Sequence, residues 1–197
     1  MPAVMTPPRA FSFPRTKSWT VDEFHDVRET GVWDGLRTFL IQGTIWEQGP
    51  MNPPHANSVD LISEMLRAAF GIQYRVRCQL PLVLGFDTDP MPDVAVVRGG
   101  PRDFSTVHPT TAELVVEVAD TTLFQDTTTK AELYAEAGIQ EYWVVDVDQS
   151  KLLVFRDPAP ISVGGFHYRN QQTLSKSDSI TPLALSNSAL SVADLLI

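Results

Sequence analysis

Two charged residues occupy positions where a purely structural segment would be apolar. Glu117 interrupts the apolar run at residues 114–118, where a strand covered on both faces is expected. Lys130 precedes Leu133 and Tyr134 by three and four residues, on the helix face that should pack against the sheet. Ionised side chains are rarely buried unless they are paired or bind a metal. The two charges therefore indicate a site, although a buried structural ion pair would also account for them.

A second carboxylate, that of Asp93, opens another apolar strand at residues 94–97. If this strand neighbours the first, Asp93 and Glu117 converge at one end of the sheet. Two carboxylates with water and a backbone carbonyl, which we assign to Val118, suit a hard divalent ion such as Mg²⁺ or Mn²⁺. Lys130 adds a compact cation beside them. Such a set suits phosphodiester hydrolysis, in which the metal polarises the phosphate and the lysine orients the attacking water.

The segment 113–147 predicts the elements that hold this site: a buried strand, a helix and a second buried strand. Asp126 is expected to cap the start of the helix rather than to bind metal, and Gly138 to end it in a left-handed conformation. The second strand, at residues 142–145, is rich in aromatic and β-branched residues, and Glu141 before it is expected at the edge of the site. Strands joined in this way normally run parallel with a right-handed crossover.

Upstream of Asp93 the sequence predicts a helix at residues 21–29 and strands at residues 36–41 and 44–47. A second helix is predicted after Pro53 and Pro54, with the apolar stripe Val59, Ile62, Met65, Leu66 and Ala69. Thr20 and Glu23 form a capping box for the first helix, and Gly71 ends the second. His55 lies at the mouth of the second helix. We interpret it as a capping or packing residue, with a catalytic role as the alternative.

Residues 72–80 alternate between apolar and polar side chains. The face predicted to be buried consists of Ile72, Tyr74, Val76, Cys78 and Leu80, and the opposite face of Gln73, Arg75, Arg77 and Gln79. We interpret the polar face as the solvated side of an antiparallel sheet, with contacts to phosphates as the alternative. Beyond residue 147 the sequence predicts a hairpin partner and three edge elements, at residues 151–156, 166–169, 180–185 and 190–197.

The composition is that of a globular protein. The 197 residues are 43% hydrophobic and 20% charged, and we assign an N-terminal arm to residues 1–17 and one domain to residues 18–197. The formal net charge of −9 argues against strong non-specific binding of nucleic acid, but local patches and bound cations still allow a nucleic-acid enzyme. The single cysteine, Cys78, excludes a disulfide framework and a cysteine-based zinc site. No apolar stretch indicates a signal segment or a membrane span, so a soluble cytoplasmic protein is expected.

These residues resemble a known pattern. Pro92-Asp93 followed by Glu117-Val118-Ala119 is similar to the short and degenerate PD-(D/E)XK motif of the restriction-endonuclease-like superfamily. The longer stretch EVADTTLFQDTTTKAELYAEAGIQEYWVVD resembles the more specific signature of the Uma-type family of proposed bacterial endonucleases. The matching positions here are Glu117, Asp126, Lys130, Tyr134 and residues 138–146. The resemblance covers most of residues 18–156.

The resemblance implies an α/β fold with a restriction-endonuclease-like αβββαβ core, a mixed sheet flanked by helices, and a β-rich C-terminal extension. It also implies an endonuclease that acts on DNA with Mg²⁺ or Mn²⁺. The metal would bind at Asp93, Glu117 and the Val118 carbonyl, and Lys130 would position the water, with His55 as a further catalytic candidate. A homodimer is expected by analogy with nucleases that cut two strands.

Two departures from the pattern keep other functions open. The third residue of the Glu-x-Lys triplet is Ala119, so its role falls to Lys130. Phe39 stands where the family tends to have an acidic residue, which Glu47 or Glu113 would have to replace. Phe39 and the net charge favour a non-catalytic relative that binds nucleic acid or protein through the same scaffold. A metallohydrolase of small phosphoesters is a third alternative, which would need a closed pocket.

Overall fold

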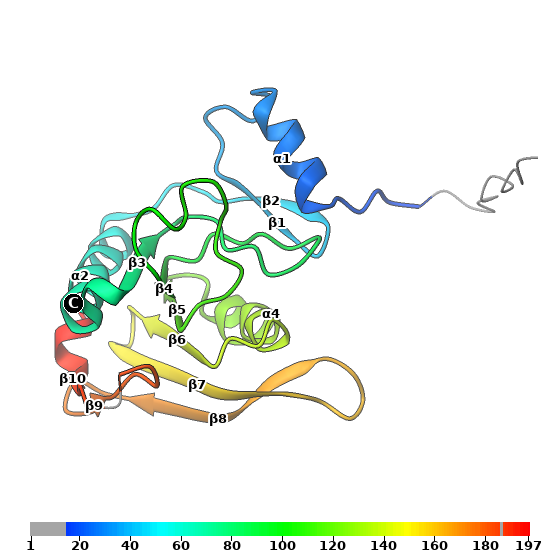
Figure 1. Ribbon diagram of the computed structural model, residues 1–197. Helices are drawn as coiled ribbons and strands as arrows, with labels where there is room; N and C mark the ends of the chain where they lie inside the picture. The colour runs from blue at the N-terminus through cyan, green and yellow to red at the C-terminus, as the bar shows by residue number, and fades with distance from the viewer. Residues whose placement is uncertain (1–14, 186) are drawn as a thin grey trace, which may run out of the picture.

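A six-stranded mixed sheet forms the centre of the molecule (Figure 1). The structure is a computed structural model that describes residues 15–185 and 187–197. In the order β3-β4-β5-β6-β7-β8, the strands are Tyr74–Cys78, Val94–Arg98, Leu114–Ala119, Glu141–Asp146, Lys151–Pro160 and Phe166–Leu174. Among these strands β5 and β6 pair in parallel, as their connection through a helix requires, and the other pairs are antiparallel.

The two faces of β5 are covered by different helices. Val116 packs in one hydrophobic core with α2, Pro53–Phe70. Val115 packs in a second core beneath the helical segment at residues 123–136. Because side chains alternate along a strand, Glu117 shares the face of Val115. The sheet therefore presents this carboxylate to the helix that carries the lysine.

The helical segment between β5 and β6 contains a π-helical turn. In order it consists of α3, Leu123–Gln125, then η2, Asp126–Lys130, and then α4, Ala131–Glu136. The predicted N-cap at Asp126 is wrong, because the helix begins at Leu123 and Asp126 lies fully buried inside it. The hydroxyls of Thr127 and Thr128 donate to carbonyls of the preceding turn, at 2.7 and 2.5 Å, and such bonds compete with regular helical ones. π-helical turns are rare and are frequent at functional sites.

Gly138 adopts the left-handed conformation predicted for the end of this helix. Its φ is +75°, and a Cβ at this position would meet no atom within 4 Å. Gly138→Ala therefore adds backbone strain without a clash, and we expect it to lower the free energy of unfolding by about 1 kcal/mol, measured in urea. Gly49→Ala is the matched control, because Gly49 has equally open surroundings and no positive φ. Equal stability of the two variants would contradict this account.

The strand predicted at residues 72–80 is shorter than expected. Gly71, with φ +67°, starts a 3₁₀ turn before β3, so Ile72 is 96% exposed instead of buried. Pairing with β4 ends at Cys78, and Leu80 is also exposed. On the face predicted to be solvated, Arg77 is buried beneath an aromatic ring of the loop that follows β4. The alternation of residues within the strand could not predict this burial, because it depends on a loop elsewhere in the sequence.

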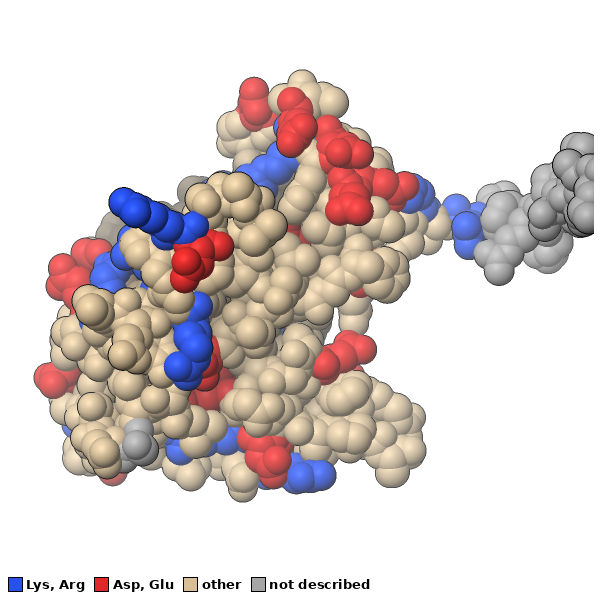
Figure 2. All heavy atoms as spheres, in the orientation of Figure 1, with Lys and Arg blue, Asp and Glu red and all other residues tan. Residues whose placement is uncertain are grey.

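A smaller layer consists of α1, Val21–Glu29, and the hairpin of β1, Thr38–Ile41, and β2, Thr44–Glu47 (Figure 1). The predicted capping box is present, because the Thr20 hydroxyl accepts from the Glu23 N–H and the Glu23 carboxylate accepts from the Thr20 N–H. Figure 2 shows acidic side chains gathered over α1, where the helix carries Asp22, Glu23, Asp26 and Glu29. This part of the surface is electrostatically unsuited to a phosphate backbone.

The C-terminal residues form a β-rich extension. β9, Ser179–Ile180, pairs with β10, Leu190–Ser191, and the 3₁₀ turn η3, Val192–Leu195, packs in the same core as α2. Residues 1–14 of the predicted arm lie outside the described residues, so its boundary at residue 17 stays a prediction. Within residues 15–185 and 187–197, none of the helices has the length and apolar character needed to span a bilayer.

Candidate active site

Asp93 and Glu117 meet at one end of the sheet. β4 and β5 are antiparallel with Val94 opposite Val116, so the residue before β4 lies beside the second half of β5. Asp93 Oδ2 accepts a hydrogen bond from the Val118 N–H at 2.9 Å, and the Asp93 N–H donates to Glu117 Oε2 at 3.4 Å. Only 3% of Asp93 and 2% of Glu117 are exposed. Two buried carboxylates thus lie side by side.

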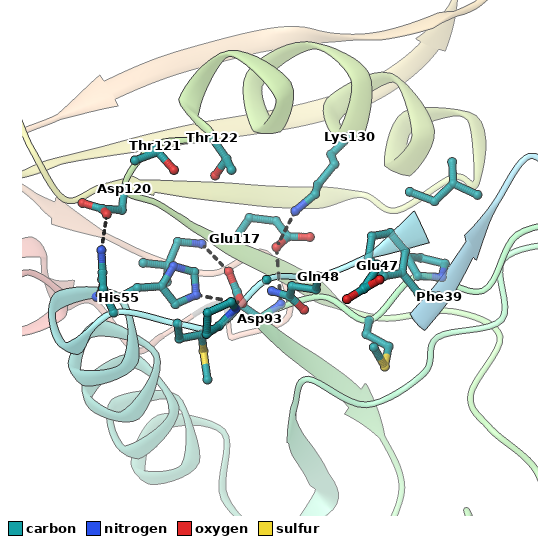
Figure 3. Close-up of a pocket in the computed structure, with 18 of the residues that line it drawn as sticks. Phe39, Glu47, Gln48, His55, Asp93, Glu117, Asp120, Thr121, Thr122 and Lys130 are labelled. Atoms are coloured by element: carbon teal, nitrogen blue, oxygen red, sulfur yellow. Dashed lines mark hydrogen bonds and ion pairs between the residues drawn. The ribbon is translucent and has the colours of Figure 1, made fainter. Parts of the chain in front are cut away.

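Lys130 reaches these strands from the π-helical turn (Figure 3). Its Nζ lies 3.0 Å from Glu117 Oε2 and 2.8 Å from Asp126 Oδ1. Tyr134, on the following helical turn, donates its hydroxyl to Glu117 Oε1 at 2.7 Å. The Lys130 side chain is 29% exposed. The ammonium is therefore held by two buried carboxylates and remains accessible to a ligand.

His55 and Gln79 complete the groups around Asp93. His55 Nε2 lies 3.1 Å from Asp93 Oδ1, and Gln79 Nε2 donates to the same oxygen at 3.2 Å. Asn52 caps α2 and accepts from the His55 N–H, which fixes the start of the helix and hence the place of the histidine. Gln79 was not predicted at this site, because the alternation of residues 72–80 places it on a solvated strand face. Its left-handed backbone, φ +50°, turns it toward Asp93, and no glycine or asparagine signalled that turn.

Burial and charge oppose each other in this cluster. Burial raises the pKa of Glu117 to about 7, with Lys130 opposing the rise and the carboxylates of Asp93 and Asp126 adding to it. Burial also acts to raise the pKa of Asp93, but the hydrogen bond and charge of His55, the Val118 N–H and the charge of Lys130 together outweigh it, and the pKa is lowered. That same hydrogen bond raises the pKa of His55. Burial acts to lower the pKa of Lys130, but the neighbouring carboxylates raise it, so the ammonium stays protonated.

The carboxylates open into a pocket of about 360 Å³. The hairpin contributes to its lining: Phe39 and Ile41 come from β1, Glu47 comes from β2, and Gln48 follows β2. Figure 3 shows Phe39 and Glu47 on one side of the pocket and His55 and Asp120 on the other, with Asp93, Glu117, Lys130 and Gln48 between them. The charged cluster thus forms the middle of the pocket, not its rim.

The position that lacks an acidic residue also lies in this pocket. Phe39 is one of the residues that line it. Of the two acids that could replace the missing one, Glu47 lines the pocket, whereas Glu113 forms an ion pair with Arg98, at 3.0 Å, toward the other end of β4. Glu47 is therefore the one of the two that is placed to assist the site.

Glu141 does not lie at the edge of the site, contrary to the prediction. The parallel register of β5 and β6 places Glu117 opposite Val144, so Glu141 lies toward the other end of the sheet. Its fully buried carboxylate accepts hydrogen bonds from the Arg156 guanidinium, from Trp143 Nε1 at 2.9 Å and from the Leu183 N–H at 2.7 Å. Glu141 therefore links the sheet to the C-terminal extension.

The donor set fits a hard divalent cation. Asp93 and Glu117 offer carboxylate oxygens from neighbouring strands, and each ionised carboxylate has about four lone-pair sites, so their hydrogen bonds leave capacity for a metal. A ligand role for the Val118 carbonyl stays a prediction. Within the described part of the chain, no three His, Cys, Asp or Glu residues form a cluster that could hold a metal. Water or substrate oxygens would therefore complete the coordination, as is usual for Mg²⁺.

This fold is that of the restriction-endonuclease-like α/β proteins. The model of the Uma2 family, described as "Putative restriction endonuclease", matches residues 21–193, and the chain belongs to this family. A similar fold is found in the crystal structure of "a putative nuclease belonging to DUF820" from Anabaena variabilis, with a TM-score of 0.68 and 19% identity over 89% of this chain and 96% of the other. No curated protein matches the chain. The predicted family and fold class are confirmed.

Proposed function

We propose that this protein is a divalent-metal-dependent endonuclease that hydrolyses phosphodiester bonds of DNA. Membership of a family described as restriction endonucleases supports nucleic acid as the substrate class. The observation that carries the proposal is the convergence of Asp93, Glu117 and Lys130 in one pocket, with Nζ 3.0 Å from Glu117 and the two carboxylates on adjacent strands. A purely structural ion pair would not need a second buried carboxylate at the same place.

Each group has a role in this proposal. Asp93, Glu117 and the Val118 carbonyl hold Mg²⁺ or Mn²⁺, which supplies Lewis acidity at the phosphate when bound. Lys130 stays protonated, so it acts as a positive charge that orients the attacking water and offsets negative charge in the transition state. His55 orients Asp93 through their hydrogen bond. As a group beside that carboxylate that can carry a proton, His55 is also the candidate to protonate the leaving oxygen. The expected homodimer stays a prediction.

The test is cleavage of supercoiled plasmid by the purified protein in Mg²⁺, in Mn²⁺ and in EDTA. We expect nicking with either metal and none in EDTA. Asp93→Ala, Glu117→Ala and Lys130→Ala should each reduce nicking to background, because each removes a metal ligand or the charge beside it. Asp22→Ala is the matched control, since Asp22 is an exposed acid on α1 and should leave nicking unchanged.

Three other outcomes would redirect the assignment. Nicking that survives in all three site variants would come from a contaminant and overturn the proposal. Mn²⁺ binding that depends on Asp93, without cleavage by the wild type, would support the non-catalytic relative. Hydrolysis of p-nitrophenyl phosphate but not of bis(p-nitrophenyl) phosphate would support a hydrolase of small phosphomonoesters.

A further inference from the structure

The wall of the pocket beyond its charged groups is largely apolar. Its apolar residues include Phe39, Ile41, Pro50, Met51, Met91 and Leu133. A phosphate or a ribose would gain little from such a wall, whereas a flat aromatic ligand can stack on Phe39 and contact the aliphatic side chains. Gln48 also lines the pocket and lies between Asp93 and Glu47 in Figure 3, and its side-chain amide has no hydrogen-bond partner among the described residues. The apolar wall thus comes with a free polar group that can read the edge of a planar ring.

Trp46 continues this aromatic surface outside the pocket. In the register of β1 and β2, Trp46 lies directly opposite Phe39, so both side chains project from the same face of the hairpin. Trp46 is 51% exposed, although tryptophan is usually well buried. Consecutive aromatic rings on one surface are the arrangement on which successive bases of a single strand stack.

The charges of the pocket argue against binding led by phosphates. Its lining contains the carboxylates of Glu47, Asp93, Glu117 and Asp120. Lys130 is the one lysine or arginine among these lining residues, and it is already paired with two carboxylates. A duplex held through its backbone needs several lysines or arginines to neutralise phosphates. Beyond the phosphate held at the divalent cation, affinity for nucleic acid needs a further contact, and stacking is the one that the pocket offers.

We propose that the Phe39 side of the pocket is a nucleobase subsite and that the preferred substrate is therefore single-stranded DNA. The subsite rests on the proposed function, because the base that it holds belongs to the nucleotide whose phosphate lies at Asp93 and Glu117. Phe39 stacks on that base and Gln48 bonds its edge, while Trp46 stacks on the next base along the strand. A paired base must first leave its duplex to enter, which costs free energy and disfavours double-stranded DNA.

Fluorescence anisotropy with a labelled 12-nucleotide single strand and the matching duplex tests this subsite, with Ca²⁺ in place of Mg²⁺. We expect the single strand to bind about tenfold more tightly than the duplex. Phe39→Leu keeps the apolar volume but removes the ring, so it should weaken single-strand binding about tenfold, and Phe39→Tyr should restore it. Phe86→Leu is the matched control, because Phe86 is 76% exposed and lies outside this pocket.

Equal affinity for the two DNA forms, or an equal effect of Phe39→Leu and Phe86→Leu, would overturn the subsite. Circular dichroism melting of each variant establishes that a loss of binding is not a loss of fold. Nicking of plasmid by the wild type without a preference for single strands would reject the subsite and keep the nuclease. Single-strand binding that depends on Phe39, in a protein that cleaves nothing, would keep the subsite and reject the nuclease.

Discussion

Glu117→Gln is expected to abolish plasmid cleavage and, at the same time, to stabilise the metal-free protein. Glutamine keeps the shape of the side chain but removes a carboxylate from the donor set, so we expect cleavage to fall by at least about a thousandfold. The stability gain has a separate cause. Asp93, Glu117 and Asp126 are all buried, and the ammonium of Lys130 pairs with Glu117 and Asp126, while Asp93 pairs with His55. Removing one of three negative charges relieves repulsion and desolvation that the ammonium offsets only in part.

The gain in stability should depend on pH. Burial raises the pKa of Glu117 to about 7 from an ordinary value of 4.5, so the folded wild-type protein binds this proton more tightly than the unfolded chain does. Wild-type stability therefore decreases as the pH rises between these two values, and the glutamine variant lacks this loss. In EDTA we expect the variant to exceed the wild type by about 1 kcal/mol at pH 8 and by less at pH 5, in urea unfolding.

Glu64→Gln is the matched control, because Glu64 is an exposed acid in the middle of α2 and its loss should leave stability unchanged at both pH values. A Glu117→Gln protein that is less stable than the wild type at pH 8 would contradict the charge argument. It would show that the contacts of the carboxylate with Lys130 and Tyr134 outweigh the cost of its burial. Cleavage that persists in this variant would remove Glu117 from the donor set.

Glu141→Ala is expected to lower the free energy of unfolding by about 3–5 kcal/mol and to leave the site intact. The Arg156 guanidinium, whose side chain is 21% exposed, loses the carboxylate that it pairs with. The donors of Trp143 and Leu183 lose their acceptor as well. Leu183 belongs to the C-terminal extension, so that segment loses its link to β6. Urea denaturation followed by tryptophan fluorescence measures the change.

Asp157→Asn is the matched control for this variant, because asparagine removes the charge and still tolerates the left-handed backbone of this position, whose φ is +61°. Asp157 pairs with Arg169 at 3.5 Å, and the two side chains are 47% and 60% exposed, so the pair should contribute nothing that urea denaturation can detect. Because Glu141 lies away from the pocket, cleavage per folded molecule should equal that of the wild type. If the fully folded Glu141→Ala protein cleaved less than the wild type, Glu141 would contribute to the site after all.

The sequence predicted well those features that depend on local patterns. The apolar runs of β5 and β6 identified two strands covered on both faces, and Gly138 marked the end of the helix between them. Glu117 and Lys130 could be singled out because each breaks an apolar pattern, and the structure brings them into contact. The capping box of α1 was readable for the same reason, since its two partners are three residues apart.

The features that the sequence did not reveal depend on contacts between distant segments. Asp126 looks like an N-cap locally, but the chain is already helical before it and the residue is enclosed by the fold. Arg77 follows a solvated pattern, yet a later loop covers it. Glu141 opens a strand near the site in sequence, whereas its partners Arg156 and Leu183 come from β7 and the C-terminal extension. No periodicity within a single element contains this information.

The charged groups of the pocket come from separate elements, and this determines when they can act. Asp93 and Glu117 are 24 residues apart, and Lys130 belongs to the helix that follows β5. Contacts over such separations form late, after local turns and helices. Until β4, β5 and the helical segment have packed together, each of these groups is an ordinary side chain in water. A nascent or partly unfolded chain therefore lacks the reactive arrangement, and its chemistry is confined to the native state.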